Sequence, residues 1–522
     1  MNVAERKVGQ STLAVLLDGL TAERVPALPI ADLSAHSGSV AAGGAFLACA
    51  GLRGHGLDHL AEALAAGAAA VIWEPAAGVT APGVPDHVAS IPVDGLGRHA
   101  GEIASRFFGA PSQRMRIAGV TGTNGKSTCA HLIATSLERR GRPCGFLGTL
   151  GFGRPDSLQR TALTTADAVT LQRRLAGLDE NGVRYAAMEV SSHALDQGRV
   201  GGVHFEAAVF TNLSRDHLDY HGDRSSYGAA KARLFTHCDT ERAVINAGDA
   251  FGRELLERLG GRLSPVVVAL EPLSPRREGG ERVRKAGAAR RAVERGAARV
   301  LHGRLTRSDA RGVQIRFTGS WGAGTLCSAL IGEFNAENLL LALAVLLIWD
   351  LPLDEALAGL AGASAAPGRM ERFGGGDRPL AIVDFAHTPA ALARALEASR
   401  SICAGQLWCV FGCGGERDRG KRGLMGEIAE QHADRVVITD DNPRGEDAER
   451  IVRDIQSGMA NPAAVTVERD REAAIAVALA SAQPEDVVLV AGKGHEDYQL
   501  VGDERRAFSD REVVARLAGP VS

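Results

Sequence analysis

The sequence lacks the features that would suggest export or membrane insertion. Its 522 residues include only eight cysteines, and no two of them form a Cys-x-x-Cys pair. Such scattered cysteines fit neither a disulfide framework nor a zinc site, which indicates a reducing compartment. The first ten residues are polar, and the longest apolar run, 339–349, is well short of the roughly 20 residues that a bilayer span needs. We therefore expect a cytoplasmic protein without a membrane span.

The sequence also lacks an excess of positive charge. It has 59 Lys+Arg against 62 Asp+Glu, a formal net charge of -3, so the basic field that nucleic-acid binding usually needs is missing. One Arg-rich segment, 270–303, has no interleaved aromatic residues of the kind that stack on bases. We interpret it as a solvated face or an insertion, and we do not expect nucleic acid as a partner.

A glycine-rich stretch, 119–128, is the most informative part of the sequence. It follows a short apolar run, 115–120, and precedes a segment with helical spacing, 127–140, so its glycines fall at a strand-to-helix turn. There, backbone N–H groups and the helix N-terminus can hold an anion, Lys126 adds a full positive charge, and the Ser127 hydroxyl can bind Mg²⁺. The pattern predicts a phosphate loop, although five residues rather than the usual four separate Gly119 from Gly125.

The length favours several domains, and we predict three. Residues 1–112 read as a small α/β domain, with a helix at 59–70 followed by a strand at 69–73. Strands and helices alternate through 113–366, which predicts a doubly wound parallel sheet around the loop, with a buried helix at 338–348. A Pro-Gly pair marks the start of the third predicted domain, 367–522, where short apolar strands predict a second, Rossmann-like sheet. The predicted strands of this last domain are 380–384, 407–411, 435–439 and 487–490.

Several polar clusters follow strand-like runs, and together with the loop they resemble one family. The loop letters Gly-Thr-Asn-Gly-Lys-Ser are typical of the Mur ligases and the folylpolyglutamate synthetases, which join an amino acid to a carboxylate with ATP. The other motifs are similar to Mur ligases, above all to members that add the third peptide residue to UDP-N-acetylmuramoyl-L-alanyl-D-glutamate. These motifs lie at 164–165, 189–193, 211–221, 227–231, 332–338, 367–369, 383–389, 411–422, 441–444 and 492–496.

The resemblance implies a reaction through an acyl phosphate, because a carboxylate accepts an amine poorly until it is activated. That transfer gathers negative oxygens, so cations must gather too. The implied catalytic residues are Lys126, Glu189, His217 and Lys231, and the implied Mg²⁺ ligands are Ser127, Glu189, His217 and Lys231. Lys231 matches a lysine that the family carbamylates with CO₂, which replaces an ammonium by an anion able to bind a second Mg²⁺. The implied ATP-binding residues are Gly122, Thr123, Asn124, Gly125, Lys126, Ser127, Thr128, Asn335, Asn338, Arg369 and Asp384. Arg369 is expected to reach the phosphates when the last domain closes over the central one.

The resemblance also implies where the UDP-sugar-dipeptide binds. The matching residues are Ser37, Thr164, Thr165, Ser191, Gln197 and Arg199. The sequence departs from the family pattern at three places: His36 and Gly38 stand where aspartate and arginine are usual, and Leu163 replaces a frequent asparagine. These departures affect the expected contacts to the UDP-substrate.

The last domain matches the family's amino-acid site. The implied residues are Arg417, Asp441, Asn442, Pro443, Arg444, Gly492 and Glu496. Asp-Asn-Pro-Arg at 441–444 is the version that accompanies meso-diaminopimelate, whereas ligases that add L-lysine usually lack the arginine. L-lysine addition, a folylpolyglutamate synthetase and an inactive regulatory homologue remain as alternatives. We expect a monomer.

Overall fold

The computed structural model describes residues 11–51, 54–273 and 299–520. These residues form two compact units. The first contains the described residues up to 121 together with 141–209 and 229–243, and the second contains 122–140, 210–228 and the described residues from 244 onward. No helix within the described ranges has both the length and the apolar character needed to cross a bilayer.

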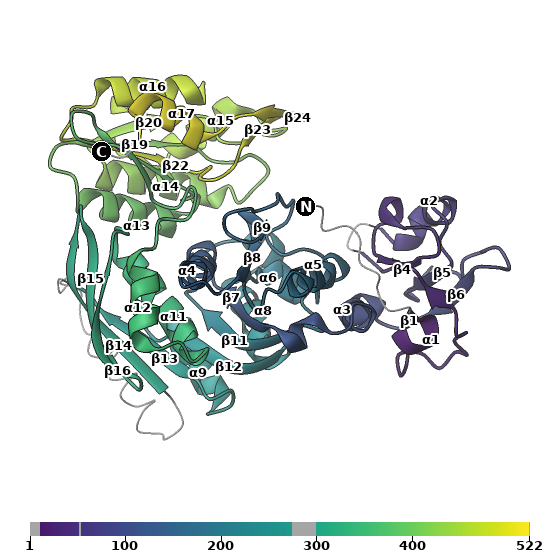
Figure 1. Ribbon diagram of the computed structural model, residues 1–522. Helices are drawn as coiled ribbons and strands as arrows, with labels where there is room; N and C mark the ends of the chain where they lie inside the picture. The colour runs from purple at the N-terminus through teal and green to yellow at the C-terminus, as the bar shows by residue number, and fades with distance from the viewer. Residues whose placement is uncertain (1–10, 52–53, 274–298, 521–522) are drawn as a thin grey trace. The chain divides into compact units, whose positions relative to one another are not determined.

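The first unit begins with a small parallel sheet of strand order β3-β4-β5-β6, drawn in purple in Figure 1. The helix predicted at 59–70 is α2, which ends at Ala65, because Gly67 adopts a positive φ of 91° and turns the chain into β5. The elements of this part are β1 (Ser11–Thr12), α1 (Leu13–Leu16), β2 (Pro29–Ile30), β3 (Leu33–Ser34), β4 (Ala45–Ala48), α2 (Leu60–Ala65), β5 (Ala70–Trp73), β6 (Ala89–Pro92) and α3 (Leu96–Phe107).

The rest of the first unit centres on parallel strands with buried, apolar side chains. Strand β10 pairs in parallel with both β7 and β8, which is why these strands read as continuous apolar runs. Glu189, the last residue of β10, pairs with Val120 of β7, so it stands at the edge of the sheet from which the glycine-rich loop leaves. The elements are β7 (Arg116–Thr121), β8 (Cys144–Gly148), β9 (Gly151–Gly153), α5 (Ala168–Glu180), β10 (Tyr185–Glu189), α6 (Ser192–Asp196), β11 (His204–Phe210), α8 (Arg224–Thr236) and β12 (Asp239–Asn246).

The largest sheet has the order β16-β15-β14-β13-β12-β11-β7-β10-β8-β9. Its middle is parallel, as predicted, but β14, β15 and β16 form an antiparallel meander and β9 pairs antiparallel with β8. In the second unit, α4 packs against α11 and α12. The predicted helix at 338–348 is confirmed as part of α11, which is buried on all sides from Asn338 to Ile348. The elements are α4 (Lys126–Arg139), α7 (Leu218–His221), α9 (Ala250–Leu259), β13 (Val266–Glu271), β14 (Arg299–Asp309), β15 (Gly312–Gly319), β16 (Gly322–Ser328), α11 (Glu333–Ile348) and α12 (Leu353–Ala361).

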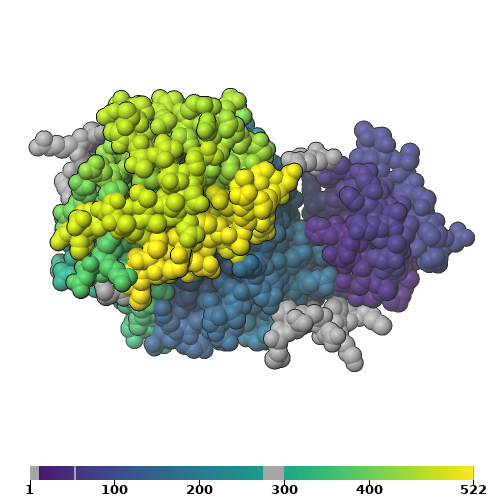
Figure 2. Space-filling model, turned by 90° about the horizontal axis from the view of Figure 1, so that it is seen from above, coloured from purple at the N-terminus to yellow at the C-terminus, as the bar shows by residue number. Residues whose placement is uncertain are grey.

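Residues from 371 onward, green to yellow in Figures 1 and 2, form a six-stranded sheet of order β17-β18-β22-β19-β20-β21. All of its pairs are parallel except β17 with β18, and helices cover both faces, so the predicted doubly wound sheet is confirmed. The elements are β17 (Glu371–Gly374), β18 (Leu380–Asp384), α13 (Pro389–Arg400), β19 (Leu407–Phe411), α14 (Gly420–His432), β20 (Arg435–Ile438), α15 (Ala448–Gln456), β21 (Thr466–Val467), α16 (Arg471–Ser481), β22 (Val487–Ala491), the hairpin β23 (Tyr498–Val501) and β24 (Glu504–Ala507), and α17 (Asp510–Ala518).

The Arg-rich segment predicted at 270–303 is shorter than expected at both ends. Residues 270 and 271 belong to β13, and β14 already begins at Arg299. Its arginine pairs, Arg276-Arg277 and Arg290-Arg291, and Arg295 lie outside the described residues.

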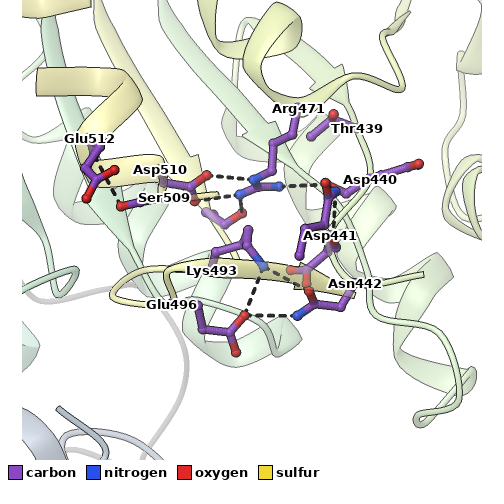
Figure 3. A network of polar contacts seen from close by, with 12 residues as sticks. Thr439, Asp440, Asp441, Asn442, Arg471, Lys493, Glu496, Ser509, Asp510 and Glu512 are labelled. Atoms are coloured by element: carbon purple, nitrogen blue, oxygen red, sulfur yellow. Dashed lines mark hydrogen bonds and ion pairs between the residues drawn. The ribbon is translucent and has the colours of Figure 1, made fainter. Parts of the chain in front are cut away.

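A buried ion pair ties α16 to α17 in the last sheet. Arg471 donates to both carboxylate oxygens of Asp510, at 2.7 and 2.8 Å, and neither side chain is exposed (Figure 3). Removing one partner of such a pair leaves a buried charge without compensation, which typically costs about 3–5 kcal/mol. We therefore expect Asp510→Asn to lower the free energy of unfolding of the last sheet by about 3 kcal/mol. Hydrogen exchange of the β22 amides at increasing urea concentration measures this change. Glu472→Gln, which breaks the exposed pair with Arg516, should change it by less than about 0.5 kcal/mol.

Candidate active site

The glycine-rich loop connects β7 to α4 and is held by the segment that follows β11. Thr211 Oγ1 donates to the Asn124 oxygen at 2.6 Å, and the Asn212 amide both donates to and accepts from the Asn124 main chain, at 3.0 and 3.1 Å. A Cβ on Gly122, whose φ is 149°, would lie 1.8 Å from Thr211 Oγ1, so only glycine fits there. Two segments far apart in sequence thus fix the loop before any ligand arrives.

Lys126 is the first residue of α4 and lies across the loop. Its Nζ donates to the main-chain oxygens of Gly122 and Thr123, both at 2.9 Å. Ser127 and Thr128 follow on the same turn and are buried. No side chain from the described residues caps α4, whose N-cap is Gly125. A helix N-terminus, a lysine ammonium and a hydroxyl therefore converge on one turn, an arrangement suited to a phosphate with its metal ion.

The two predicted nucleotide-binding asparagines stand on the first turns of α11, which packs beside α4. Asn338 Nδ2 donates to Asn335 Oδ1 at 3.3 Å, and Asn335 Nδ2 donates to the Ile331 oxygen at 2.8 Å. A Cβ on Gly125 would approach Asn338 Oδ1 to 2.6 Å. The structure thus brings Asn335 and Asn338 to the glycine-rich loop.

Arg369 and Asp384 also meet this group. Arg369 Nη2 donates to Ser127 Oγ at 3.1 Å, and its guanidinium lies over the Phe385 ring, 4.3 Å from the centroid. Burial raises the pKa of Asp384 to about 6, although the Arg369 charge and main-chain N–H groups, including that of Met370, oppose the rise. All the predicted ATP-binding residues therefore belong to one compact unit, and Arg369 already reaches the loop.

His217 belongs to a cluster of ionisable groups that surrounds Asp216. Its Nε2 lies 3.4 Å from Asp216 Oδ2, and His387 Nε2 lies 4.0 Å from the same oxygen. Burial alone would raise the pKa of Asp216, but the nearby positive charges, first that of His387 and then those of His217, Lys421 and Lys126, hold it below its ordinary value. Lys421 Nζ also donates to the His387 main-chain oxygen at 2.8 Å. This half-buried carboxylate therefore stays anionic beside the phosphate loop's lysine.

In the first unit, Glu189 is buried and held by a threonine cluster. The Thr149 N–H donates to Glu189 Oε1 at 2.8 Å, and the Thr149 hydroxyl lies 3.2 Å from Oε2 and 3.1 Å from that of Thr164. Thr165 Oγ1 donates to the Glu189 main-chain oxygen at 2.8 Å and accepts from the Ser191 N–H at 3.1 Å. A carboxylate with a fixed orientation is a suitable Mg²⁺ ligand.

The other predicted UDP-substrate residues continue from this cluster, except Ser37. Arg199 Nη1 donates to the Thr165 main-chain oxygen at 3.1 Å, and Arg199 Nε donates to Gln197 Oε1 at 2.8 Å. Ser191 is the N-cap of α6, where its Oγ accepts from the Ala194 N–H. Ser37 instead lies in the N-terminal part of the unit, where its hydroxyl donates to Glu62 Oε2 at 2.6 Å.

The three departures from the family pattern have different surroundings. His36 Nε2 lies 3.5 Å from Asp167 Oδ2, a polar contact that an aspartate at position 36 would replace by repulsion. A Cβ on Gly38 would lie 3.1 Å from Glu62 Oε1, the carboxylate that already binds Ser37. Leu163 is an exposed leucine, 47% accessible, beside the two threonines. The segment around Ser37 is therefore built around Glu62.

Lys231 lies on α8 and is only 1% exposed. The resemblance matches it to a lysine that reacts with CO₂, and a neutral amine is the form that can attack CO₂. Among the described residues, no three His, Cys, Asp or Glu side chains gather into a ready-made metal cluster. The ligand set implied by the resemblance, Ser127, Glu189, His217 and Lys231, is not of that kind and stays a prediction.

The predicted amino-acid site lies at the carboxyl edge of the last sheet. Arg444, at a positive φ of 54°, is held by the hairpin, because its N–H donates to the Leu500 oxygen and its oxygen accepts from the Gly502 N–H. Its Nη1 donates to the Gly415 oxygen at 2.8 Å. Burial lowers the pKa of Arg444, and the charge of Arg417 lowers it further. Two like charges side by side favour the binding of an anion between them.

Asp441, Asn442, Pro443, Gly492 and Glu496 surround the same edge. Asn442 Nδ2 donates to Glu496 Oε2 at 2.9 Å, and the Gly492 N–H donates to the Asp384 oxygen at 3.1 Å. Asp441 and Pro443 are buried beside them. The structure thus places the Arg417 and Arg444 cations and the Glu496 carboxylate at one edge. This arrangement is complementary to an amino acid, which carries both a carboxylate and an ammonium.

The chain is similar to known proteins over most of its length. The model of the Mur ligase middle domain matches residues 120–346, and that of the Mur ligase, glutamate ligase domain, matches 368–494. A protein of Alkalilimnicola ehrlichii named UDP-N-acetylmuramoyl-L-alanyl-D-glutamate--2,6-diaminopimelate ligase is 48% identical over 94% of this chain and 95% of its own. The chain belongs to the Mur ligase family. A second such ligase, from Pseudomonas putida, is 46% identical over 92% and 93% of the two chains.

Solved structures agree with this Mur ligase assignment. A UDP-N-acetylmuramoyl-L-alanyl-D-glutamate--2,6-diaminopimelate ligase matches 98% of this chain and 99% of its own, with a TM-score of 0.66 and 33% identity. A folylpolyglutamate synthase of Mycobacterium tuberculosis shares only the fold, with a TM-score of 0.54 and 19% identity over 75% and 91% of the chains.

Some residues of this Mur ligase site were not predicted from the sequence. Thr149 orients Glu189 but belongs to none of the quoted motifs. Asp216 stands directly before His217 within the motif at 211–221, and Lys421 lies within that at 411–422, so their motifs were the available signal. Lys493 lies between Gly492 and Glu496 and contacts two predicted site residues.

Proposed function

We propose that this chain catalyses the ATP-dependent addition of meso-diaminopimelate to UDP-N-acetylmuramoyl-L-alanyl-D-glutamate, a step of peptidoglycan precursor synthesis. The observation that carries the choice of amino acid is Arg444, which lies half buried beside Arg417 in the predicted amino-acid site. The 48% identical relative named for this activity supports it. The proposal includes a cytoplasmic, monomeric enzyme of three domains, 1–112, 113–366 and 367–522.

The ATP site consists of the glycine-rich loop with Asn335, Asn338, Arg369 and Asp384. Lys126 and the N-terminus of α4 hold the transferring phosphoryl group, because they present positive charge without reorganisation. Arg369, bound to Ser127 Oγ in this structure, turns toward the phosphates when ATP is bound. Mg²⁺ would neutralise the phosphoryl oxygens, held by Ser127, Glu189, His217 and a carbamate on Lys231.

The substrate carboxylate comes from the UDP-linked dipeptide, which Ser37, Thr164, Thr165, Ser191, Gln197 and Arg199 bind. Arg199 is positioned to neutralise an acidic group, since Gln197 and the Thr165 oxygen fix its guanidinium. The carboxylate attacks the γ-phosphorus of ATP, ADP leaves, and the acyl phosphate then accepts the amine of the incoming amino acid with release of phosphate. Arg444 holds the carboxylate at the end of that amino acid's side chain, and Arg417 and Glu496 hold the other end, with Glu496 taking the ammonium.

The experiment that tests the proposal measures ADP release by the purified protein. ADP should appear only when both the UDP-dipeptide and meso-diaminopimelate are present with ATP and Mg²⁺. Release with folate substrates, or a preference for L-lysine, would contradict the proposed substrates. An absence of any ATP turnover under these conditions would favour the inactive regulatory homologue.

Lys231 provides a separate prediction. Lys231→Ala should be inactive, because the proposed metal ligand is the carbamate and not the ammonium. Acetate or formate should restore part of the activity by occupying the vacated anion position. The measurement is ADP release by the variant at rising acetate concentration. Wild-type protein and Lys126→Ala, treated alike, should gain nothing, and full activity of Lys231→Ala without acetate would refute the carbamate.

A further inference from the structure

Lysine is rare in this chain, which makes its few lysines informative. Only six of the 59 basic residues are lysine, at positions 7, 126, 231, 285, 421 and 493, and the rest are arginine. Lys7 and Lys285 lie outside the described residues. Of the other four, Lys126 and Lys231 have proposed roles in the reaction and Lys421 contacts the cluster around Asp216. Because arginine is the basic residue at nearly every other position, the positions that keep lysine are candidates for a role that needs its compact ammonium.

Lys493 is the fourth of these, and its side chain is entirely buried. Its Nζ donates to Asn442 Oδ1 and to Glu496 Oε2, both at 3.0 Å (Figure 3). The Nζ also lies 5.5 Å from the centroid of the Tyr498 ring. A lysine ammonium has three donors and no acceptor, so two carry hydrogen bonds and the third side of the cation faces an aromatic ring. A group with no exposed surface cannot meet the substrate itself. Lys493 can act only through its neighbours.

Those neighbours form a closed triangle, visible in Figure 3. Asn442 Nδ2 donates to Glu496 Oε2 at 2.9 Å, the oxygen that also accepts from Lys493. The Leu500 N–H donates to Asn442 Oδ1 at 3.0 Å, so that oxygen has two donors and the orientation of the amide is defined. Both side-chain bonds to Glu496 use Oε2. Within the described residues Oε1 takes no hydrogen bond, and it is the oxygen left for a ligand's ammonium.

We infer that Lys493 is a positioning residue for the amino-acid substrate: it fixes the Asn442 amide and holds Glu496 by one oxygen so that the other receives the substrate's ammonium. This inference rests on the proposed function, because it assigns Glu496 to the incoming amino acid. A charge-assisted bond to a buried cation keeps the carboxylate in one rotamer and stops it turning to solvent. The site is thus set for a zwitterionic amino acid before it binds.

The test is steady-state kinetics on Lys493→Met, which keeps the length of the side chain and removes its charge. The KM for meso-diaminopimelate should rise on the order of 10- to 100-fold, because a displaced binding group commonly costs that much. The KM values for ATP and for the UDP-dipeptide should stay within about two-fold. Arg516→Met, which removes an exposed cation paired with Glu472 in the same domain, should change none of the three.

A double-mutant cycle separates positioning from general damage. If Lys493 acts through Glu496, adding Lys493→Met to Glu496→Gln should raise the KM for the amino acid by less than about two-fold beyond Glu496→Gln alone. Should Lys493→Met not fold, as judged by loss of ADP binding, Lys493→Gln replaces it in both measurements, because it retains a donor. Additive effects, or an equal loss for all three substrates, would refute the inference. An inactive wild type would instead refute the proposed function.

Discussion

Replacing Arg444 by alanine should reduce kcat/KM for meso-diaminopimelate by on the order of 10⁴-fold and leave the poor rate with L-lysine nearly unchanged. The two amino acids differ by one carboxylate at the end of the side chain. A guanidinium can hold that carboxylate through two parallel hydrogen bonds, and when L-lysine binds it stays desolvated without a partner. A site built for a polar group rejects an analogue that lacks it by several powers of ten. Steady-state kinetics with both amino acids measures the effect.

Two further variants sharpen this test. Arg444→Lys keeps the positive charge but not the two parallel donors of the guanidinium. Its loss of kcat/KM for meso-diaminopimelate should therefore be smaller than that of the alanine variant. Arg506→Ala, which removes an exposed arginine paired with Glu504 on the same hairpin, should leave both rates unchanged. The specificity assignment is wrong if Arg444→Ala weakens both amino acids equally, even though the ligase assignment would survive.

Lys126→Ala should abolish ligation and leave binding of the UDP-dipeptide nearly intact. Its ammonium spans the loop between the Gly122 and Thr123 oxygens and is the only full positive charge supplied by 119–128. Losing a charge aimed at the transferring phosphoryl group commonly costs a few kcal/mol of transition-state stabilisation, or about 10³-fold in rate. ADP release measures the first effect and isothermal titration calorimetry with the UDP-dipeptide measures the second.

The matched control for this variant is Arg140→Ala at the other end of α4, where the arginine is exposed. Its turnover should equal that of the wild type. Near-normal turnover of Lys126→Ala would contradict the assignment of the ATP site to the glycine-rich loop.

The parts of the fold that follow from local patterns were predictable. The loop between β7 and α4 and the strands β18, β19, β20 and β22 lie where apolar runs and glycines place them. The antiparallel meander β14–β16 was missed, although the alternation of buried Val313, Ile315 and Phe317 with more exposed neighbours is a strand signal. The length of α2 was overestimated, because alanines favour a helix but Gly67 ends it.

The candidate site was predictable only as far as its motifs reach. Glu189, His217 and the neighbouring Asp216 were visible as motif members, whereas the contact of Thr149 with Glu189 depends on how distant segments meet. Arg369 was expected to need domain closure, yet it already bonds to Ser127 in this structure. No pattern in a single sequence states which side chains will share a hydrogen bond.

The hairpin β23–β24 holds both ends of the proposed amino-acid pocket by its main chain. Leu500 supplies an oxygen to the Arg444 N–H and an N–H to Asn442 Oδ1, and the Gly502 N–H binds the Arg444 oxygen. Main-chain contacts persist when side chains mutate. Apart from Tyr498 and Gln499, whose side chains contact Lys493 and the Asp441 oxygen, the hairpin should therefore vary more readily in sequence than in length. For an inhibitor that occupies this pocket, resistance by point substitution in the hairpin would be difficult. An inserted or deleted residue at the turn would displace Arg444 and Asn442 together, which would impair catalysis as well as inhibitor binding.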